Sequence, residues 1–413
     1  MLIARFMILG YLSLHTVTMA QASSLTIQVE KPAYTQVVER ESGGIDLLVS
    51  IFDNDITDKV ILIEDIGEVF RKRNGTPLQK TIQPSVTWPN NISILEGATP
   101  LTAAIAGGFF NMPSRPDRTG AITLVRGKES KAITTYEKGW FYHQAEWKDV
   151  NKDGYLDIIT ARSNFNPLRY VLGPALPKKH KVRGELIWLE NPGNENFSSS
   201  ASWKSRLIVD GPEVHFSATD LDGDGENEWL AAESFQQRLR IYLPSPSGYT
   251  PRTISKSLGT LFKAEAVDLN NDQQLDLLVT NHVNTRKAGV FAFEVPKDLA
   301  SGPFKMHTLI QGIETRMTGR GQASPGEAIP VIPHKDHKGK PWVVVSGDGS
   351  SRVHLLKPVS EELDDWRYTE TVLLSAPGSI TGGMAITDLD GDGWQEVIIP
   401  LHSHNEIKIV SLR

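Results

Sequence analysis

The chain has 413 residues, a formal net charge of −6 at neutral pH and no cysteine. The negative balance argues against a nucleic-acid partner, because such partners are bound mainly through Lys and Arg. Disulfides are excluded, so a large core or bound metal ions must stabilise the fold. After the N-terminal segment, no apolar run in the sequence suggests a membrane span.

Residues 1–22 have the pattern of a secretory signal peptide. Arg5 supplies the positive charge, residues 6–17 form an apolar core too short to span a bilayer, and Ala20 and Ala22 flank a small-residue cleavage site. A buried N-terminal strand is the alternative. We predict that residues 23–413 form a single exported domain, secreted or periplasmic. Removal of Arg5 takes one positive charge from −6 and leaves −7.

Short runs of β-branched and aliphatic residues then follow one another along the chain. Residues 45–51 and 60–63 form one predicted strand pair, and residues 103–110 and 121–125 form a second. Turn residues separate the runs, and no long helical period is present. This pattern predicts an all-β fold.

Four later strand pairs share an acidic sequence motif, here also called the acidic phrase. Asp, Asn or Glu stands at its positions 1, 3, 5 and 9, and an apolar strand follows directly. The four sets are Asp149, Asn151, Asp153 and Asp157; Asp220, Asp222, Asp224 and Glu228; Asp268, Asn270, Asp272 and Asp276; and Asp388, Asp390, Asp392 and Glu396. Alternate side chains of such a loop converge on one ion, and Gly at position 6 permits the sharp turn. We predict up to four structural Ca²⁺ sites, with merely solvated turns as the alternative. Gln273 replaces this Gly in the third copy.

The spacing of the copies reveals a degenerate fifth one. The first aspartates are 71, 48 and 120 residues apart, so the last interval is two repeats long. Midway, His334, Asp336 and Lys338 occupy ligand positions and Trp342 occupies position 9. Lys338 would place an ammonium where the cation lies elsewhere, so we predict no metal in this repeat. A metal pair formed by His334 and His337 is the alternative.

The acidic phrase resembles the FG-GAP, or VCBS, repeats of integrin-like β-propellers. This resemblance implies a ring of four-stranded blades, with each acidic loop joining the two inner strands and holding a structural calcium. Two N-terminal strand pairs, four acidic copies and one degenerate copy predict seven blades. The run at 406–412 ends one strand short of a blade, so residues 25–29 are predicted to complete it and close the ring.

The implied geometry places a second polar set on the face opposite the acidic loops. His143, His215 and Lys263 precede inner strands. After the second strands come Arg162, Glu233, His282, Asp348 and His402, and Arg316 and Arg320 lie in a link before Gly326. Buried polar groups need partners, so this set indicates a polar ligand pocket, or else a wet channel. The insertion at 164–183 is predicted to be a loop covering this face or a disordered segment.

The residue types of this polar set indicate which reaction it could catalyse. Arg and Lys suit an anionic group and His suits proton transfer, which together favour β-elimination from an acidic or oxidised carbohydrate by a lyase or dehydratase. We assign catalysis to His215, His143 and Lys263, and substrate binding to Arg162, Glu233, His282, Arg320 and His402. At the level of the fold, the chain also resembles the propeller of aldos-2-ulose dehydratase. A non-catalytic glycan-binding or adhesion propeller is the alternative, and we expect a monomer.

Overall fold

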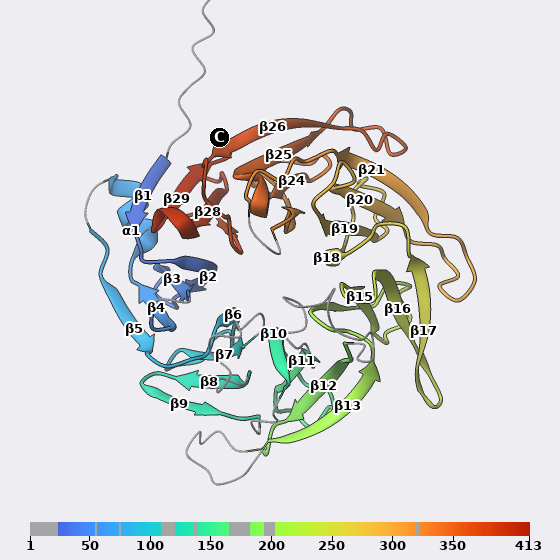
Figure 1. Ribbon diagram of the computed structural model, residues 1–413, viewed down its shortest axis with the longest axis horizontal. Coiled ribbons are helices and arrows are strands. Elements are labelled where there is room, and N and C mark those ends of the chain that lie inside the picture. The colour runs from blue at the N-terminus through green and yellow to red at the C-terminus, as the bar shows by residue number, and fades with distance from the viewer. Residues whose placement is uncertain are drawn as a thin grey trace, which may run out of the picture.

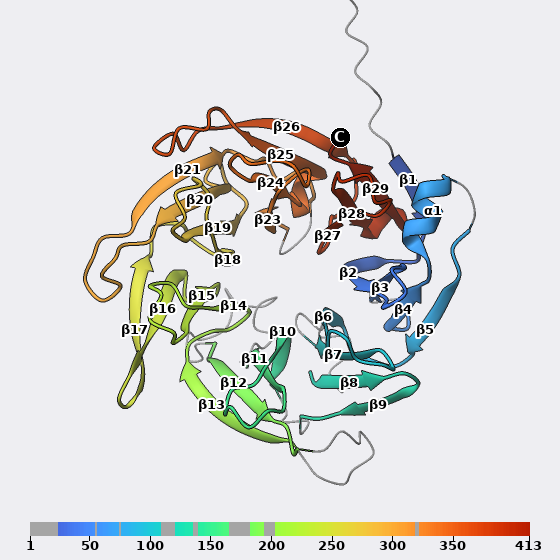
Figure 2. The same ribbon diagram turned by 180° about the vertical axis from the view of Figure 1, so that it is seen from behind.

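The computed structural model describes residues 24–53, 56–73, 76–108, 120–134, 139–164, 182–193, 203–318 and 322–413. Seven antiparallel sheets stand around a central axis, each with four strands on its main path (Figures 1 and 2). The predicted all-β, seven-bladed propeller is therefore confirmed. The predicted signal peptide, Arg320 and residues 165–181 of the insertion lie outside the described residues.

The blades are numbered here from the N-terminus, and their strands are given from the axis outwards. Blade 1 contains β2 (Pro32–Glu39), β3 (Ile45–Ile51), β4 (Lys59–Ile63) and β5 (Gln79–Gln83). Blade 2 contains β6 (Pro89–Ile94), β7 (Thr102–Gly107), β8 (Ile122–Arg126) and β9 (Glu129–Ala132). Blade 3 contains β10 (Phe141–Lys148), β11 (Asp157–Ser163), β12 (Gly184–Glu190) and β13 (Lys204–Asp210).

Blade 4 contains β14 (His215–Thr219), β15 (Glu228–Glu233), β16 (Arg238–Ser245) and β17 (Gly248–Ser255). Blade 5 contains β18 (Leu261–Val267), β19 (Asp276–Val283), β20 (Gly289–Glu294) and β21 (Lys305–Gln311), and the short β22 (Ser324–Pro325) also pairs with β19. Blade 6 contains β23 (Ala328–Val331), β24 (Trp342–Val345), β25 (Arg352–Pro358) and β26 (Tyr368–Ser375). Blade 7 contains β27 (Ala385–Thr387), β28 (Glu396–Leu401), β29 (Glu406–Ser411) and β1 (Ser24–Gln28).

The ring closes in blade 7 with a strand from each end of the described chain. Strand β1 pairs antiparallel with β29, with Leu25 opposite Ile409 and Ile27 opposite Ile407. Ile27 is buried, and the following Val29 donates its backbone N–H to the carbonyl of Asn405 at 3.0 Å. The predicted closure by the N-terminal strand is confirmed, and it covers the outer edge of β29 that would otherwise be unpaired.

The core is divided among the seven seams between neighbouring blades. Each of seven apolar clusters draws its buried side chains from two adjacent blades. The second strands are buried along their whole length in blades 2, 4 and 7, which explains their continuous apolar runs. Burial of apolar surface at every seam therefore fixes each blade against its two neighbours.

One element was not predicted. Helix α1 (Ile66–Lys72) is the single α-helix of the described residues, and it lies between β4 and β5. Ile66 and Phe70 are buried four residues apart on one helix face. A side-chain carbon on Gly67 would lie 2.7 Å from the carbonyl oxygen of Leu389, so only Gly lets the helix pack against the last acidic loop. In the part of the chain that the structure describes, no helix is long and apolar enough to cross a membrane.

Candidate functional site

The four acidic loops share one turn. In the first, Asp149 accepts the backbone N–H groups of Asp153 at 3.1 Å and Gly154 at 3.0 Å. Gly225 has a φ of 89° at position 6 of the second loop, and Gln273 has a φ of 69° at the same position of the third. Gln273 thus adopts the left-handed conformation that Gly provides elsewhere, so its departure from the sequence pattern does not change the turn.

Two of the loops gather three carboxylates at one point. Asp220, Asp222 and Glu228 in blade 4 have carboxylate oxygens within 4.8 Å of one another, and the equivalent group in blade 7 is Asp388, Asp390 and Glu396. The glutamate Oε2 accepts the backbone N–H of position 2, Leu221 or Leu389, at 2.8 Å. One carboxylate oxygen of each glutamate is among the converging atoms. Such a group of oxygens suits a hard cation such as Ca²⁺.

The other two loops use their acidic groups differently. They have Asn at position 3, and its amide donates to the aspartate at position 5: Asn151 to Asp153 at 2.8 Å and Asn270 to Asp272 at 3.1 Å. The shorter Asp157 at position 9 accepts backbone N–H groups with both oxygens, from residue 150 at 3.1 Å and residue 191 at 2.7 Å. These oxygens are therefore already paired with donors of the protein itself.

The degenerate turn of blade 6 lies between two acidic loops. His334 packs its ring against Trp394 with centroids 4.9 Å apart, and Lys335 donates its backbone N–H to Gly393 at 2.9 Å. On the other side, the Asn271 amide donates to the carbonyl of Lys338 at 3.1 Å. His337 contacts the carbonyl of Lys340 at 3.0 Å. The two histidines have separate partners, and among the described residues no group of three metal ligands includes either of them.

The predicted histidines lie at the opposite end of the inner strands. In blade 3, Lys148 pairs with Asp157 beside the acidic loop, whereas Tyr142 pairs with Arg162 at the far end. His143 therefore lies at that far end, and so does His215, the first residue of β14. We call this end of the central channel the channel mouth. The rings of His143 and His215 meet edge to face with centroids 4.5 Å apart.

Aromatic and acidic groups continue this pair around the mouth. The Tyr34 hydroxyl of blade 1 lies 3.3 Å from Nε2 of His143. On the other side, Phe262 of blade 5 lies between His215 and His282, with ring centroids 5.3 and 5.4 Å away. His282 Nε2 is 2.7 Å from the Asp348 carboxylate of blade 6. Five of the seven blades thus contribute to one connected set.

Gln144 fixes the tautomer of His215. Its amide nitrogen donates to the Phe216 carbonyl at 3.0 Å and to Glu146 at 2.5 Å. Its oxygen accepts the Phe216 N–H at 3.2 Å and lies 3.2 Å from His215 Nδ1. An oxygen accepts only from a protonated ring nitrogen, so Nδ1 carries the proton and Nε2 carries the lone pair. This Nε2 has no hydrogen-bond partner within the described residues.

Both histidines are uncharged at neutral pH. Burial lowers the pKa of His143 to about 3. Burial, followed by the charges of His143 and Lys263, lowers the pKa of His215 well below its ordinary value. Desolvation disfavours the imidazolium, so both rings stay neutral. The channel mouth therefore holds a neutral imidazole whose Nε2 lone pair is buried and has no hydrogen-bond partner among the described residues.

Lys263 is neutralised by carboxylates. Its Nζ lies 2.8 Å from Glu327 and 3.3 Å from Glu265. Burial acts to lower the pKa of Lys263, but the two glutamates outweigh burial and raise it. Burial, with the charges of Asp348 and Glu327, raises the pKa of Tyr34, so this phenol stays protonated. Acidic groups thus outnumber cations around the mouth.

The predicted substrate-binding residues mostly have partners inside the protein. Arg162 contacts Glu185 at 2.6 Å and stacks over the Trp140 ring at 4.3 Å. Glu233 accepts hydrogen bonds from Arg238 and Tyr242. His402 Nε2 lies 3.0 Å from the Phe52 carbonyl, close to the mouth. The structure therefore brings His143, His215, Lys263 and His282 together, whereas Arg162 and Glu233 face partners in their own blades.

Sequence reasoning missed Tyr34, Gln144, Phe262 and Glu327. Tyr34 occupies the start of β2, as His143 occupies the start of β10. A search for polar and aromatic residues at the start of all seven inner strands would have found Tyr34 and Phe262. The sequence alone could not assign Gln144, because β10 contains a bulge between Tyr142 and Gln144 that changes which side chains face the axis.

Comparison with known proteins identifies no family. No family model and no curated protein matches the sequence. A solved structure of a functionally unknown protein from Desulfotomaculum acetoxidans has 11% sequence identity and a TM-score of 0.44, over 86% of this chain and 89% of that one. A protein of unknown function from Dyadobacter fermentans has 12% identity and a TM-score of 0.43, over 95% of this chain and 98% of that one. Neither similarity bears on the chemistry of the mouth.

Proposed function

We propose that the protein is an exported β-propeller, stabilised by calcium, that binds a carbohydrate at the channel mouth and acts on it as a lyase or dehydratase. The observation that carries this proposal is the neutral His215, held by Gln144 in the tautomer that leaves Nε2 as a base. The Tyr34 hydroxyl lies 3.3 Å from His143 Nε2, and the ring of His143 packs against His215, so Tyr34 is a source of a proton on the far side of His143. A base and an acid at the same site are what β-elimination requires.

The elimination follows from these positions. His215 Nε2 takes the proton from the carbon next to a carbonyl or carboxyl group of the sugar. The carbon–oxygen bond one position further breaks, and a carbon–carbon double bond forms. The Tyr34 hydroxyl, whose raised pKa keeps it protonated, gives its proton to the departing oxygen, which leaves as water or as an alcohol. The proton held by His215 then passes to solvent and Tyr34 takes one up from solvent, so no oxidant or reductant is consumed.

The charges at the mouth favour an oxidised sugar over a strongly acidic one. Lys263 is paired with Glu327 and Glu265, and Asp348 is paired with His282. A polyanion would meet these carboxylates at close range. A neutral sugar with a carbonyl group would not be repelled by these carboxylates. The aromatic rings of Phe262 and Tyr34 offer such a sugar apolar faces. This preference also agrees with the resemblance to the propeller of aldos-2-ulose dehydratase.

Calcium would serve the fold and not the reaction. The resemblance to FG-GAP repeats supports ion binding in the acidic loops, and the converging carboxylates of blades 4 and 7 fit a hard cation. These loops lie at the far end of the inner strands from His215. Their ions would neutralise clustered like charges and hold each inner strand to the next.

The proposal is tested with ketosugars and uronic-acid oligosaccharides as substrates. Wild-type protein with calcium is expected to convert an aldos-2-ulose to an unsaturated product, followed by ultraviolet absorbance. His215→Ala should lower kcat by about a hundredfold or more, the range of general base catalysis. The matched control is His404→Ala, because His404 is partly exposed and its partners, the Pro377 carbonyl at 3.1 Å and Glu406 at 3.9 Å, are not residues of the proposed site. Equal turnover in both variants would contradict the assignment.

A glycan-binding protein without catalysis is the second candidate function. It is favoured by the aromatic pair Phe52 and Trp88, whose ring centroids lie 4.6 Å apart beside the mouth. Calorimetry on the same sugars separates the two candidates. Heat of binding that His215→Ala weakens, without any unsaturated product, would support binding alone.

A further inference from the structure

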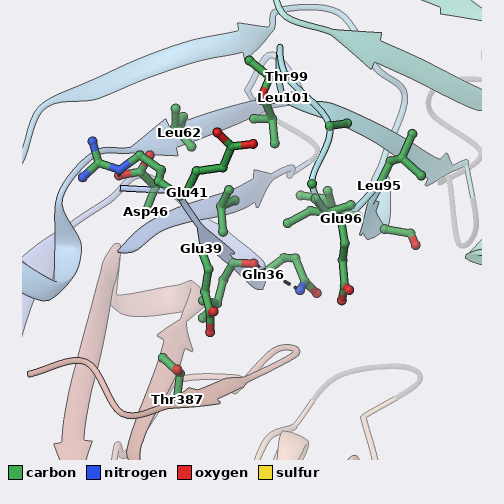
Figure 3. Close-up of a pocket in the computed structure, with 18 of the residues that line it drawn as sticks. Gln36, Glu39, Glu41, Asp46, Leu62, Leu95, Glu96, Thr99, Leu101 and Thr387 are labelled. Atoms are coloured by element: carbon green, nitrogen blue, oxygen red, sulfur yellow. Dashed lines mark hydrogen bonds and ion pairs between the residues drawn. The ribbon is translucent and has the colours of Figure 1, made fainter. Parts of the chain in front are cut away.

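A second cavity lies on the acidic-loop face, between blades 1 and 2. Its volume is about 1010 Å³, and it is bordered by the ends of β2 and β6, the turns that follow them, part of β10 and the end of β27 (Figure 3). Blades 1 and 2 have no acidic loop. The turn between β2 and β3 runs over residues 40–44, whereas the loop between β10 and β11 runs over residues 149–156. The shorter turn leaves the space open.

The floor of this cavity is apolar and aliphatic. Val38, Leu62, Ile94 and Leu101 line it, are only partly buried, and pack on the core cluster between blades 1 and 2. No aromatic side chain is among the described residues that line it. Sugar rings are usually bound against aromatic faces, so this floor suits aliphatic side chains better than a carbohydrate.

Carboxylates surround the floor. Glu39 and Glu41 come from blade 1 and Glu96 from blade 2, and all three are exposed at the edge of the cavity (Figure 3). None of the three takes part in an ion pair within the described chain. The single basic residue of the lining, Arg40, is already paired with Asp46 at 3.5 Å and with Asp65. The opening therefore has a negative potential that attracts cations.

The spacing of these charges excludes a compact metal site. In the described residues, three or more carboxylates converge only in the loops of blades 4 and 7. Glu39, Glu41 and Glu96 stand apart on two blades instead. Separate negative charges around an aliphatic floor match an extended ligand with several positive charges and apolar groups between them.

We propose that this cavity docks a basic amphipathic peptide segment, in which Lys or Arg alternates with aliphatic residues. The aliphatic side chains cover Val38, Ile94 and Leu101, and the basic side chains face Glu39, Glu41 and Glu96. Backbone and side chains of such a segment fill a cavity of this size, at the upper end of the range for ligand pockets. The cavity shares Gln144 with the channel mouth, where this side chain contacts His215, so peptide binding is measured with His215 intact.

The test is fluorescence anisotropy of a labelled synthetic peptide of alternating Lys and Leu, with calcium present. The wild-type protein is expected to bind it, and binding should weaken as salt rises. Glu39→Gln and Glu96→Gln should each weaken binding about two- to fivefold, as exposed charge pairs do, and the double variant about tenfold. Ala98→Trp should abolish binding by filling the cavity from the turn after β6. The matched control is the double variant of Glu129 and Glu226 to Gln, two exposed carboxylates outside the lining, which should change binding less than twofold.

Three results would overturn the proposal. The first is equal binding of a peptide of alternating Glu and Leu, which would show that charge plays no part. The second is equal weakening in the control double variant, which would show only a general effect of net charge. The third is binding of spermine as tight as that of the peptide and equally lost in Ala98→Trp, which would assign the cavity to a small polycation.

Discussion

The two ends of the central channel are built by different rules. At one end, each acidic loop is made within nine consecutive residues, and the same turn is repeated in four blades. At the other end, Tyr34, His143, His215, His282 and Asp348 come from five different blades and each occurs once. The repeated acidic loops stabilise the fold through residues that are close in sequence. The single residues of the channel mouth differ from blade to blade, and a strictly repeated sequence would not form such a site.

The largest expected effect comes from opening the ring that both ends share. Removing residues through Gln28 deletes β1 and leaves the edge of β29 and its apolar neighbours uncovered. We expect loss of the cooperative melting transition and aggregation, measured by calorimetry and light scattering. Thr26→Ala, an exposed change in the same strand, should leave both unchanged. A soluble truncated protein with the wild-type melting temperature would show that β1 is dispensable.

Removal of calcium should affect the acidic-loop end first. Ions that bind only the folded state stabilise it by about 2.7 kcal/mol at a hundred times their dissociation constant. A chelator should therefore lower the melting temperature by about 5 °C or more, and calcium should restore it better than magnesium. An identical melting curve in excess chelator would show that bound calcium does not stabilise the fold.

The two kinds of acidic loop should respond differently to substitution. Glu396→Gln removes a ligand from a group of three converging carboxylates, and it should cost up to about 2.7 kcal/mol of the calcium-dependent stabilisation. Asp157→Asn alters an oxygen already paired with backbone N–H groups, and it should leave the calcium-dependent part unchanged. The measurement is the difference in unfolding free energy with and without calcium. Equal losses in both variants would mean that all four loops bind alike.

The contrast between features made by nearby residues and features made by contacts between blades also decides which parts of the structure could be predicted from sequence. Strand count, acidic turns and ring closure depend on nearby residues or on one missing strand, and the sequence predicts them. The geometry of the mouth depends on seams between blades: the sequence contains His215 and Gln144, but not that Gln144 of blade 3 orients His215 of blade 4. Helix α1 was missed because seven residues are too few to establish a helical period. Substrate binding by Arg162 was predicted from its residue type, and its contact with Glu185 appears only in the fold.

A smaller effect is expected from Glu213, which lies fully buried just before β14. Burial, partly opposed by the Phe235 N–H and reinforced by Glu233, raises the pKa of Glu213 from 4.5 to about 8. A raised carboxyl pKa gives stability that is complete below pH 4.5 and is lost as the pH rises through 8. The lowered pKa values of His143 and His215 act in the opposite sense, so the effect of Glu213 is read as the difference in unfolding free energy between the wild type and Glu213→Gln. With calcium saturating, this difference should fall between pH 5 and pH 8 by about 1.4 kcal/mol per unit at most.

Urea unfolding at several pH values checks this expectation. Glu213→Gln has no proton to lose, so its unfolding free energy should rise relative to that of the wild type over the same range. Glu129→Gln, an exposed change on β9, should follow the wild type. A Glu213→Gln protein with the wild-type pH slope would show that this carboxyl group is ionised at neutral pH.

The central claim is that the channel mouth contains a neutral imidazole base, and it can be measured without knowing the substrate. Nitrogen-15 spectra of the histidine rings, assigned with His143→Gln and His215→Gln, report protonation and tautomer directly. We expect His215 to keep its proton on Nδ1 and a lone pair on Nε2 from pH 8 down to about pH 5, and His143 to stay neutral over the same range. Protonation of both rings near pH 6.5 would contradict this expectation.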